Sequence, residues 1–159
     1  GALFFYGEKD PDAIILDNHI QIKAMYGLNI DFSEIDDISL IEKSMSDIGF
    51  GIRTNGYGGI GEALKGNFKS DTIGETLLFV QSKSSPTIKI DRTNMKEVYI
   101  SLRNSERTEQ LYRELIENIP LKWVLAYCYY SLISITRSRL PSHIKIGLDS
   151  RLIHYNVQH

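Results

Sequence analysis

The sequence is poor in cysteine and in long apolar runs. Cys128 is the only cysteine among the 159 residues, so no disulfide can form within the chain. This fits a reducing compartment, and we expect a cytoplasmic protein. The most apolar stretch lies between Lys122 and Arg137 and is too short to span a bilayer. The chain starts on the apolar run 2–6, which predicts a strand cut in mid-protein, so we expect an upstream segment.

The chain also lacks a large excess of positive or negative charge. The net charge is −2, which excludes a chain that binds nucleic acid by its overall charge. Basic residues form no stripe interleaved with aromatic residues, and we therefore expect no nucleic-acid partner. The charge is uneven along the chain: residues 1–80 carry −7 and residues 81–159 carry +5. This asymmetry is typical of two oppositely charged faces, and it also suits a binding face.

Short alternating runs dominate the first two thirds of the chain. Residues 13–16, 20–25 and 28–32 are apolar or alternate between apolar and polar, and turn residues separate them, which predicts a β-meander. Residues 33–45 suit either a helix or a strand, and we expect a turn that leads into a strand. Three more strands are predicted at 76–81, 87–91 and 97–102.

Glycines are concentrated between the meander and these later strands. Residues 49–66 hold seven of the twelve glycines, which predicts a long irregular loop. Because loops on a rigid sheet often carry binding, we interpret residues 48–68 as a recognition element. Its candidate ligand-binding residues are Arg53, Asn55, Tyr57 and Lys65. The alternative is that the glycines only permit tight turns against the sheet.

Two helices and a hairpin are predicted in the last third. The first helix begins at Ser105 or Thr108, has an apolar face, and ends before Pro120. We therefore expect one domain at 1–119 and a helical and hairpin extension at 120–159. The extension helix is apolar over much of its circumference, which indicates burial or a partner. Its aromatic residues are candidates for self-association: Trp123, Tyr127 and Tyr130.

One set of residues suggests an enzyme. Glu8, Asp12 and Lys23 resemble the site of metal-dependent PD-(D/E)xK nucleases, in which carboxylates hold a metal and a lysine stabilises the charged transition state. Gln21 stands where a second carboxylate is usual, and alternation alone places a polar pair there. A GxGxxG pattern at 56–61 lacks the βαβ context of a dinucleotide site. The four histidines have no metal-ligand spacing. We expect no catalytic residue, no cofactor and no metal, and keep the nuclease as the alternative.

Residues 13–118 resemble a bacterial pleckstrin-homology (PH)-like domain of the uncharacterised small-protein type. The most family-like pieces are Arg53-Thr54-Asn55-Gly56 with Gly58, and Gly66-Asn67-Phe68. The resemblance implies a mainly β (α+β) fold, a PH-like split barrel of two antiparallel sheets with a C-terminal helix. It also implies a protein, peptide or lipid partner. Residues 120–159 have no counterpart in the family pattern. The resemblance therefore implies a non-catalytic binding or assembly module, the soluble part of a membrane-associated bacterial protein, at the inner face of the membrane.

Overall fold

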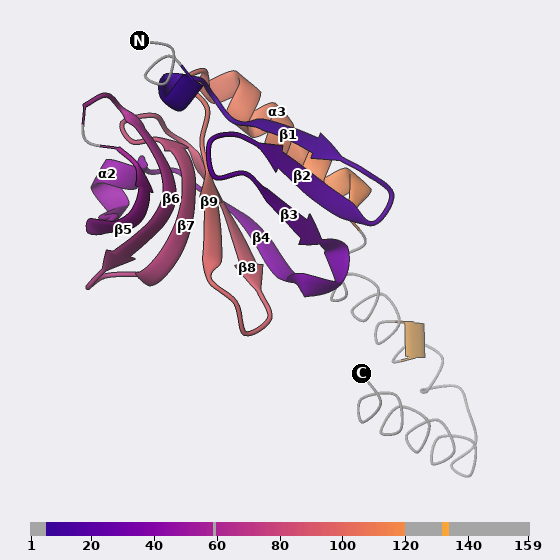
Figure 1. Cartoon of the computed structure of the whole chain (residues 1–159). Helices are drawn as coiled ribbons and strands as arrows, with labels where there is room; N and C mark the ends of the chain where they lie inside the picture. The colour runs from indigo at the N-terminus through magenta and orange to yellow at the C-terminus, as the bar shows by residue number, and fades with distance from the viewer. Residues whose placement is uncertain (1–5, 59, 120–131, 134–159) are drawn as a thin grey trace. The chain divides into compact units, whose positions relative to one another are not determined.

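The computed structural model describes residues 6–58, 60–119 and 132–133, which form a mainly β fold with helices (Figure 1). The chain divides into two compact units, Gly1–Leu121 and Lys122–His159. All the strands described below belong to the first unit. In the second, Leu132 and Ile133 are helical. The rest of the predicted extension helix, the hairpin and the proposed aromatic contacts of Trp123, Tyr127 and Tyr130 lie outside the described residues.

The predicted β-meander is confirmed as a three-stranded antiparallel sheet. It consists of β1 (Asp12–Ile15), β2 (His19–Lys23) and β3 (Leu28–Asp31). Strand periodicity directs Ile20 and Ile22 to the same face, and both are buried. Tyr6 lies in a helical turn, so the predicted first strand is wrong at this residue.

The second sheet has six strands in the order β4-β8-β9-β7-β6-β5. Its strands are β4 (Ile35–Ile41), β5 (Ile52–Tyr57), β6 (Ala63–Ser70), β7 (Gly74–Gln81), β8 (Thr87–Arg92) and β9 (Glu97–Ile100). A 3-10 turn, η1 (Phe32–Glu34), leads into β4, which confirms the turn and strand expected there. β7 and β9 pair in parallel, so the expectation of two purely antiparallel sheets is wrong for this sheet. The two sheets do not close into a barrel.

The glycine-rich segment forms a β-hairpin that follows a short helix, so the predicted irregular loop is wrong. α2 (Met45–Ile48) precedes β5, which pairs with β6 along its length. Gly56 and Gly66 are cross-strand partners, with φ of +149° and +111°. A Cβ on Gly56 would lie 2.1 Å from the carbonyl oxygen of Lys65. Here the glycines permit a close approach of two strands.

Helix α3 (Ser105–Asn118) confirms the predicted helix, although Asn104 is its N-cap rather than Ser105 or Thr108. Leu111 and Leu115 turn its apolar face towards a core that lies between the meander, β4, β8 and β9. In Figure 1, α3 runs behind β1 and β2. A second apolar cluster, with Met45 and Phe68, lies under α2. Among the helices of the described residues, none is both long and apolar enough to cross a membrane.

Candidate functional site

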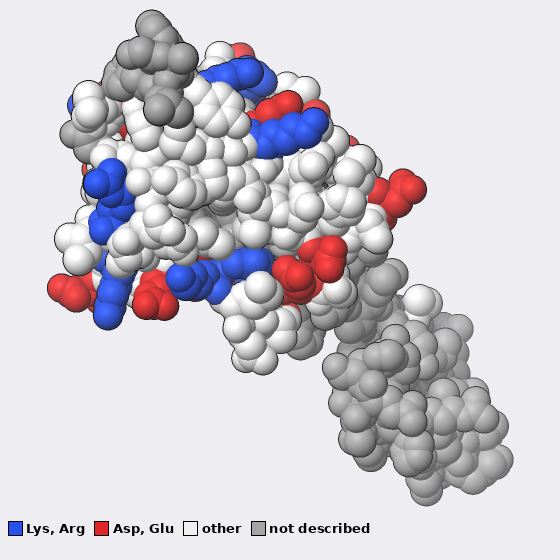
Figure 2. Space-filling model, in the orientation of Figure 1, with Lys and Arg blue, Asp and Glu red and all other residues white. Residues whose placement is uncertain are grey.

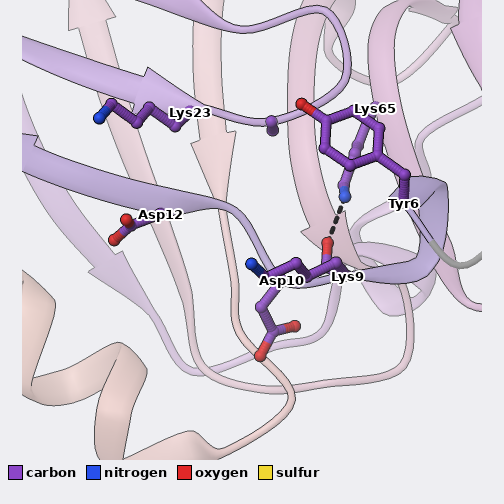
Figure 3. A pocket seen from close by; sticks show the side chains of 7 residues that line it. Tyr6, Lys9, Asp10, Asp12, Lys23 and Lys65 are labelled. Atoms are coloured by element: carbon purple, nitrogen blue, oxygen red, sulfur yellow. Dashed lines mark hydrogen bonds between the residues drawn. The ribbon is translucent and has the colours of Figure 1, made fainter.

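A pocket of about 160 Å³ lies where the N-terminal segment passes the ends of β1 and β2 and reaches β6 (Figure 3). Figure 2 shows charged side chains of both signs at the upper edge of the described part, near the start of β1, and others along its lower edge. The floor includes Lys65 and Ala24, whereas Lys9, Lys23 and Tyr6 are exposed at the rim. The complete lining is Tyr6, Lys9, Asp10, Asp12, Lys23, Ala24 and Lys65.

Lys65 is the unusual residue of this pocket, because its side chain is only 1% exposed. It extends from β6, and its Nζ donates a hydrogen bond to the carbonyl oxygen of Lys9. Burial lowers the pKa of Lys65, although the carboxylates of Asp10 and Glu8 oppose that shift. An ammonium group has three N–H donors, and the Lys9 carbonyl is its one hydrogen-bond acceptor among the described residues. The buried amine therefore retains donor capacity at the pocket floor.

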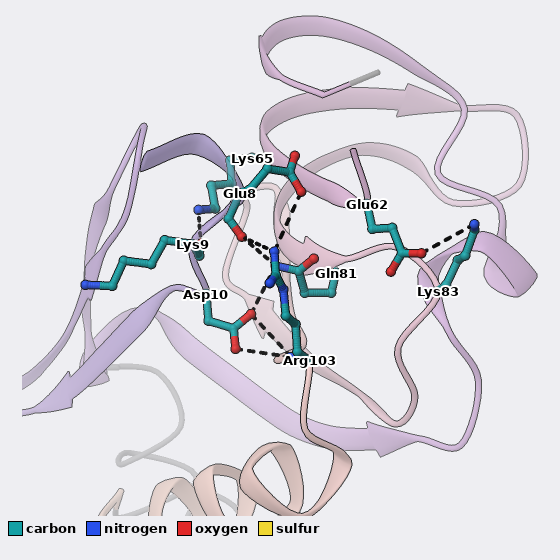
Figure 4. A network of polar contacts seen from close by, with 8 residues as sticks. All are labelled: Glu8, Lys9, Asp10, Glu62, Lys65, Gln81, Lys83 and Arg103. Atoms are coloured by element: carbon teal, nitrogen blue, oxygen red, sulfur yellow. Dashed lines mark hydrogen bonds and ion pairs between the residues drawn. The ribbon is translucent and has the colours of Figure 1, made fainter. Parts of the chain in front are cut away.

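A network of polar contacts holds the segment that supplies the Lys9 carbonyl (Figure 4). Gln81, buried at the end of β7, donates from Nε2 to the carbonyl oxygen of Glu8 at 3.1 Å. The same amide donates to Oδ1 of Asp10 at 3.0 Å. These two bonds lie on either side of Lys9 and fix its backbone against the sheet.

Arg103, which follows β9, holds the same segment from a second direction. Its backbone N–H lies 3.3 and 3.2 Å from the two carboxylate oxygens of Asp10. Its Nη2 donates to the Glu8 carbonyl at 2.9 Å and lies 3.8 Å from Oε2 of Glu8. The Asp10 carboxylate is therefore directed to Arg103 and Gln81, away from the Lys65 amine (Figures 3 and 4).

The Glu8 side chain lies against Gly61 and close to Tyr57, whose ring packs against Gly7. A Cβ on Gly61 would lie 2.3 Å from the Glu8 carboxylate, and one on Gly7 would lie 2.4 Å from the Tyr57 ring. Burial and the nearby Glu8 carboxylate raise the pKa of Tyr57. Oε1 of Glu8 and the hydroxyl of Tyr57 are buried without a hydrogen-bond partner among the described residues. This is a tightly packed polar junction beside the pocket.

The four ligand-binding residues predicted from the sequence separate into two pairs. Tyr57 and Lys65 are cross-strand partners of β5 and β6, and they lie against the N-terminal segment. Arg53 and Asn55 are exposed on β5, at the edge of the sheet, and Arg53 Nη1 donates to the carbonyl oxygen of Gly58 at 2.7 Å. Lys65 is the member of the set that lines the pocket.

The residues of the nuclease alternative are brought together only in part. Asp12 and Lys23 are cross-strand partners of β1 and β2, and both line the pocket. Glu8 is instead held by Arg103 and packed at Gly61. Across the described ranges, no group of three or more His, Cys, Asp or Glu is placed to hold a metal ion.

A scan against protein-family models found no match, and neither did searches of curated proteins and of solved structures. The site is therefore interpreted from its own residues.

Six residues of the site and its support were not predicted from the sequence: Tyr6, Lys9, Asp10, Ala24, Gln81 and Arg103. The contacts that join them span 56 to 95 residues along the chain. One local signal was present, because Gln81 is a polar residue at the end of an apolar strand whose periodicity directs it inward. A buried amide needs partners, so its position indicates a polar contact.

Proposed function

We propose that this chain is a non-catalytic binding module, and that the pocket floored by Lys65 holds a polar group of its ligand. One observation carries the proposal. Lys65 is buried, has one acceptor among the described residues, and lines a pocket that opens to solvent between exposed side chains. Burial of a charged group with incomplete hydrogen bonding is costly, so a ligand that supplies acceptors gains affinity there.

The support around the pocket favours binding. Gln81 and Arg103 fix the backbone on both sides of Lys9, so the wall is ordered before a ligand arrives. A preorganised wall reduces the entropy lost on association. At the rim, Lys9 and Lys23 are exposed and form no ion pair within the described part of the chain, so both can contact a ligand.

We also retain the PH-like assignment of residues 13–118 as a proposal. The order of elements supports it, since a meander and further strands precede a helix. The parallel pair of β7 and β9 departs from the family pattern described above. A protein, peptide or lipid partner, membrane association and self-association remain predictions of the same kind.

Three small probes of similar size and different charge test the pocket: butyrate, butyramide and butylammonium. Each is titrated into the ¹⁵N-labelled chain while amide shifts are followed by NMR. We expect at least one probe to shift the amides of Lys9, Ala24 and Lys65 saturably. The Lys65→Met variant should lose that response. If no probe moves these amides, or if saturable shifts occur only at Arg53 and Asn55, the proposal fails.

A further inference from the structure

The charges around the pocket restrict what it can bind. Three lysines and two aspartates line it, which leaves a formal charge of +1. Asp10 is occupied by the Gln81 amide and the Arg103 backbone N–H. Asp12 stands opposite Lys23 in the strand register, so it offsets a rim charge rather than the Lys65 charge. Lys65 is therefore the cation at the floor with free donors, and the formal charge of +1 matches a ligand with one negative charge.

Size and surface chemistry restrict the ligand further. A cavity needs roughly 10–15 Å³ to hold a single water, so a pocket of 160 Å³ accommodates a group of several heavy atoms. The Tyr6 ring, 53% exposed, and the methyl group of Ala24 provide apolar surface beside the lysines. A small anionic group joined to a short apolar body fits both features.

We propose that the pocket binds the carboxylate of a small, singly charged organic acid, with Lys65 donating at the floor and Lys9 and Lys23 at the rim. The inference rests on the proposed function and names its ligand class. A carboxylate has two oxygens and about four lone-pair sites, which match the free donors of Lys65 and those of a rim lysine. Charge-assisted hydrogen bonds of this type are stronger than those between two neutral groups. A dianion would exceed the positive charge of the pocket and meet Asp12.

The test compares butyrate with its neutral and cationic counterparts at constant ionic strength, by calorimetry and by NMR. We expect butyrate to bind and butyramide to bind at least about tenfold more weakly, because it lacks the charge that strengthens the bonds to Lys65. Phosphate at a pH where it is a dianion should bind more weakly than butyrate. N-acetyl-alanyl-alanine distinguishes a small acid from a peptide end: weaker binding than butyrate supports the small acid, whereas tighter binding contradicts it and indicates a peptide carboxylate.

Variants locate the site. Lys65→Met should weaken butyrate binding about tenfold or more, whereas Lys69→Met, an exposed lysine of the same strand, should leave it unchanged. Lys23→Gln, at the exposed rim, provides a variant that avoids the buried position, and we expect a two- to fivefold loss.

Several outcomes separate this inference from the function on which it rests. The carboxylate assignment fails if butyrate and butyramide bind equally, or if butylammonium or phosphate binds more tightly than butyrate. The pocket would still be a binding site. Absence of any saturable shift at Lys9, Ala24 and Lys65 overturns both. If a folded Lys65→Met variant retains its affinity for butyrate, the acid binds elsewhere on the chain, and the assignment of a carboxylate site at Lys65 fails.

Discussion

The apolar core and the polar junction at the N-terminal segment are built in opposite ways. The core between the meander, β4, β8, β9 and α3 is built on a cluster of thirteen buried apolar residues. The junction comprises the buried carboxylate of Glu8, amide of Gln81 and amine of Lys65. The exposed guanidinium of Arg103 completes it. Apolar burial contributes about 25 cal/mol per Å² without directional requirements. Polar burial contributes little net free energy but is costly when a partner is lost, so the junction fixes geometry where the core provides stability.

The largest effect should come from the core. Phe79→Ala removes a fully buried ring from the middle of β7. We expect the free energy of unfolding to fall by about 3–5 kcal/mol, because transfer and cavity terms add. Urea denaturation followed by circular dichroism measures the change. Leu77→Ala, at a partly buried position on the same face, is the control and should cost less. Equal losses at both positions would argue against a concentrated core.

A smaller effect is expected at the junction. Gln81→Met keeps the side-chain volume but removes both hydrogen bonds to the N-terminal segment. We expect a loss of about 1–3 kcal/mol, since the Glu8 carbonyl and one Asp10 oxygen lose a buried donor. Combination with Asp10→Ala should be less than additive if the two side chains form one unit. Full additivity in the double-mutant cycle would show that the network does not act together.

Sequence reasoning succeeded where structure follows local periodicity. The meander, the strand after η1, the strands β7 to β9 and the helix α3 were all predicted, because alternation and helical spacing report which face is buried. It failed at β5 and β6, where glycine density was interpreted as a long irregular loop. Gly56 and Gly66 instead face each other across two paired strands. No local pattern distinguishes a glycine that loosens a loop from one that permits close strand approach.

The candidate site was predicted only at isolated residues. Lys65, Asp12 and Lys23 were each singled out, but in two unrelated hypotheses. Their convergence depends on the register of β1 with β2 and on contacts that tie the N-terminal segment to β6 and β7. Such long-range pairing is decided by tertiary packing, which a single sequence does not encode in any short window. The same limit explains why Arg103, 93 residues from Asp10, was missed.

The helix that borders the core offers a test of local capping. Asn104 accepts a hydrogen bond from the backbone N–H of Arg107 at 3.1 Å and begins α3. Asn104→Ala should cost about 1 kcal/mol of stability, because one N–H at the helix start loses its partner. Asn118→Ala, at the exposed end of the same helix, is the matched control and should change stability by less. Reversal of this order in urea denaturation would contradict the capping role.

The smallest effect is expected at an exposed ion pair. Lys83 and Glu62 lie 3.4 Å apart with side chains 73% and 52% exposed. Lys83→Ala should change the free energy of unfolding by less than about 0.5 kcal/mol, since solvent and salt screen such pairs. A loss comparable to that of Gln81→Met would show that surface charge, rather than the buried junction, orders this part of the molecule.

Two lysines provide the reference for the central measurement. Burial alone would lower the pKa of both lysines. At Lys89 the carboxylates of Asp91 and Glu97, at 3.3 and 3.6 Å, outweigh burial, and the net effect raises the pKa. At Lys65 burial prevails and the pKa is lowered. Between that lowered value and the unfolded value of about 10.4, the unfolded chain binds more protons, so stability should rise with pH. The titratable or charged groups around Lys65 are Tyr6, Glu8, Lys9, Asp10, Asp12, Lys23, Tyr57 and Arg103.

The most direct test is an NMR titration of the chain labelled at lysine Cε, with Lys65→Met and Lys89→Met used to assign the two signals. We expect Lys65 to lose its proton at a lower pH than Lys89, and its signal to shift when butyrate is added at neutral pH. Butyrate binding should weaken as the pH rises through the titration of Lys65, because the ammonium group loses its proton and its charge. If Lys65 titrates together with Lys89 and does not respond to butyrate, Lys65 is not a buried amine that receives a ligand.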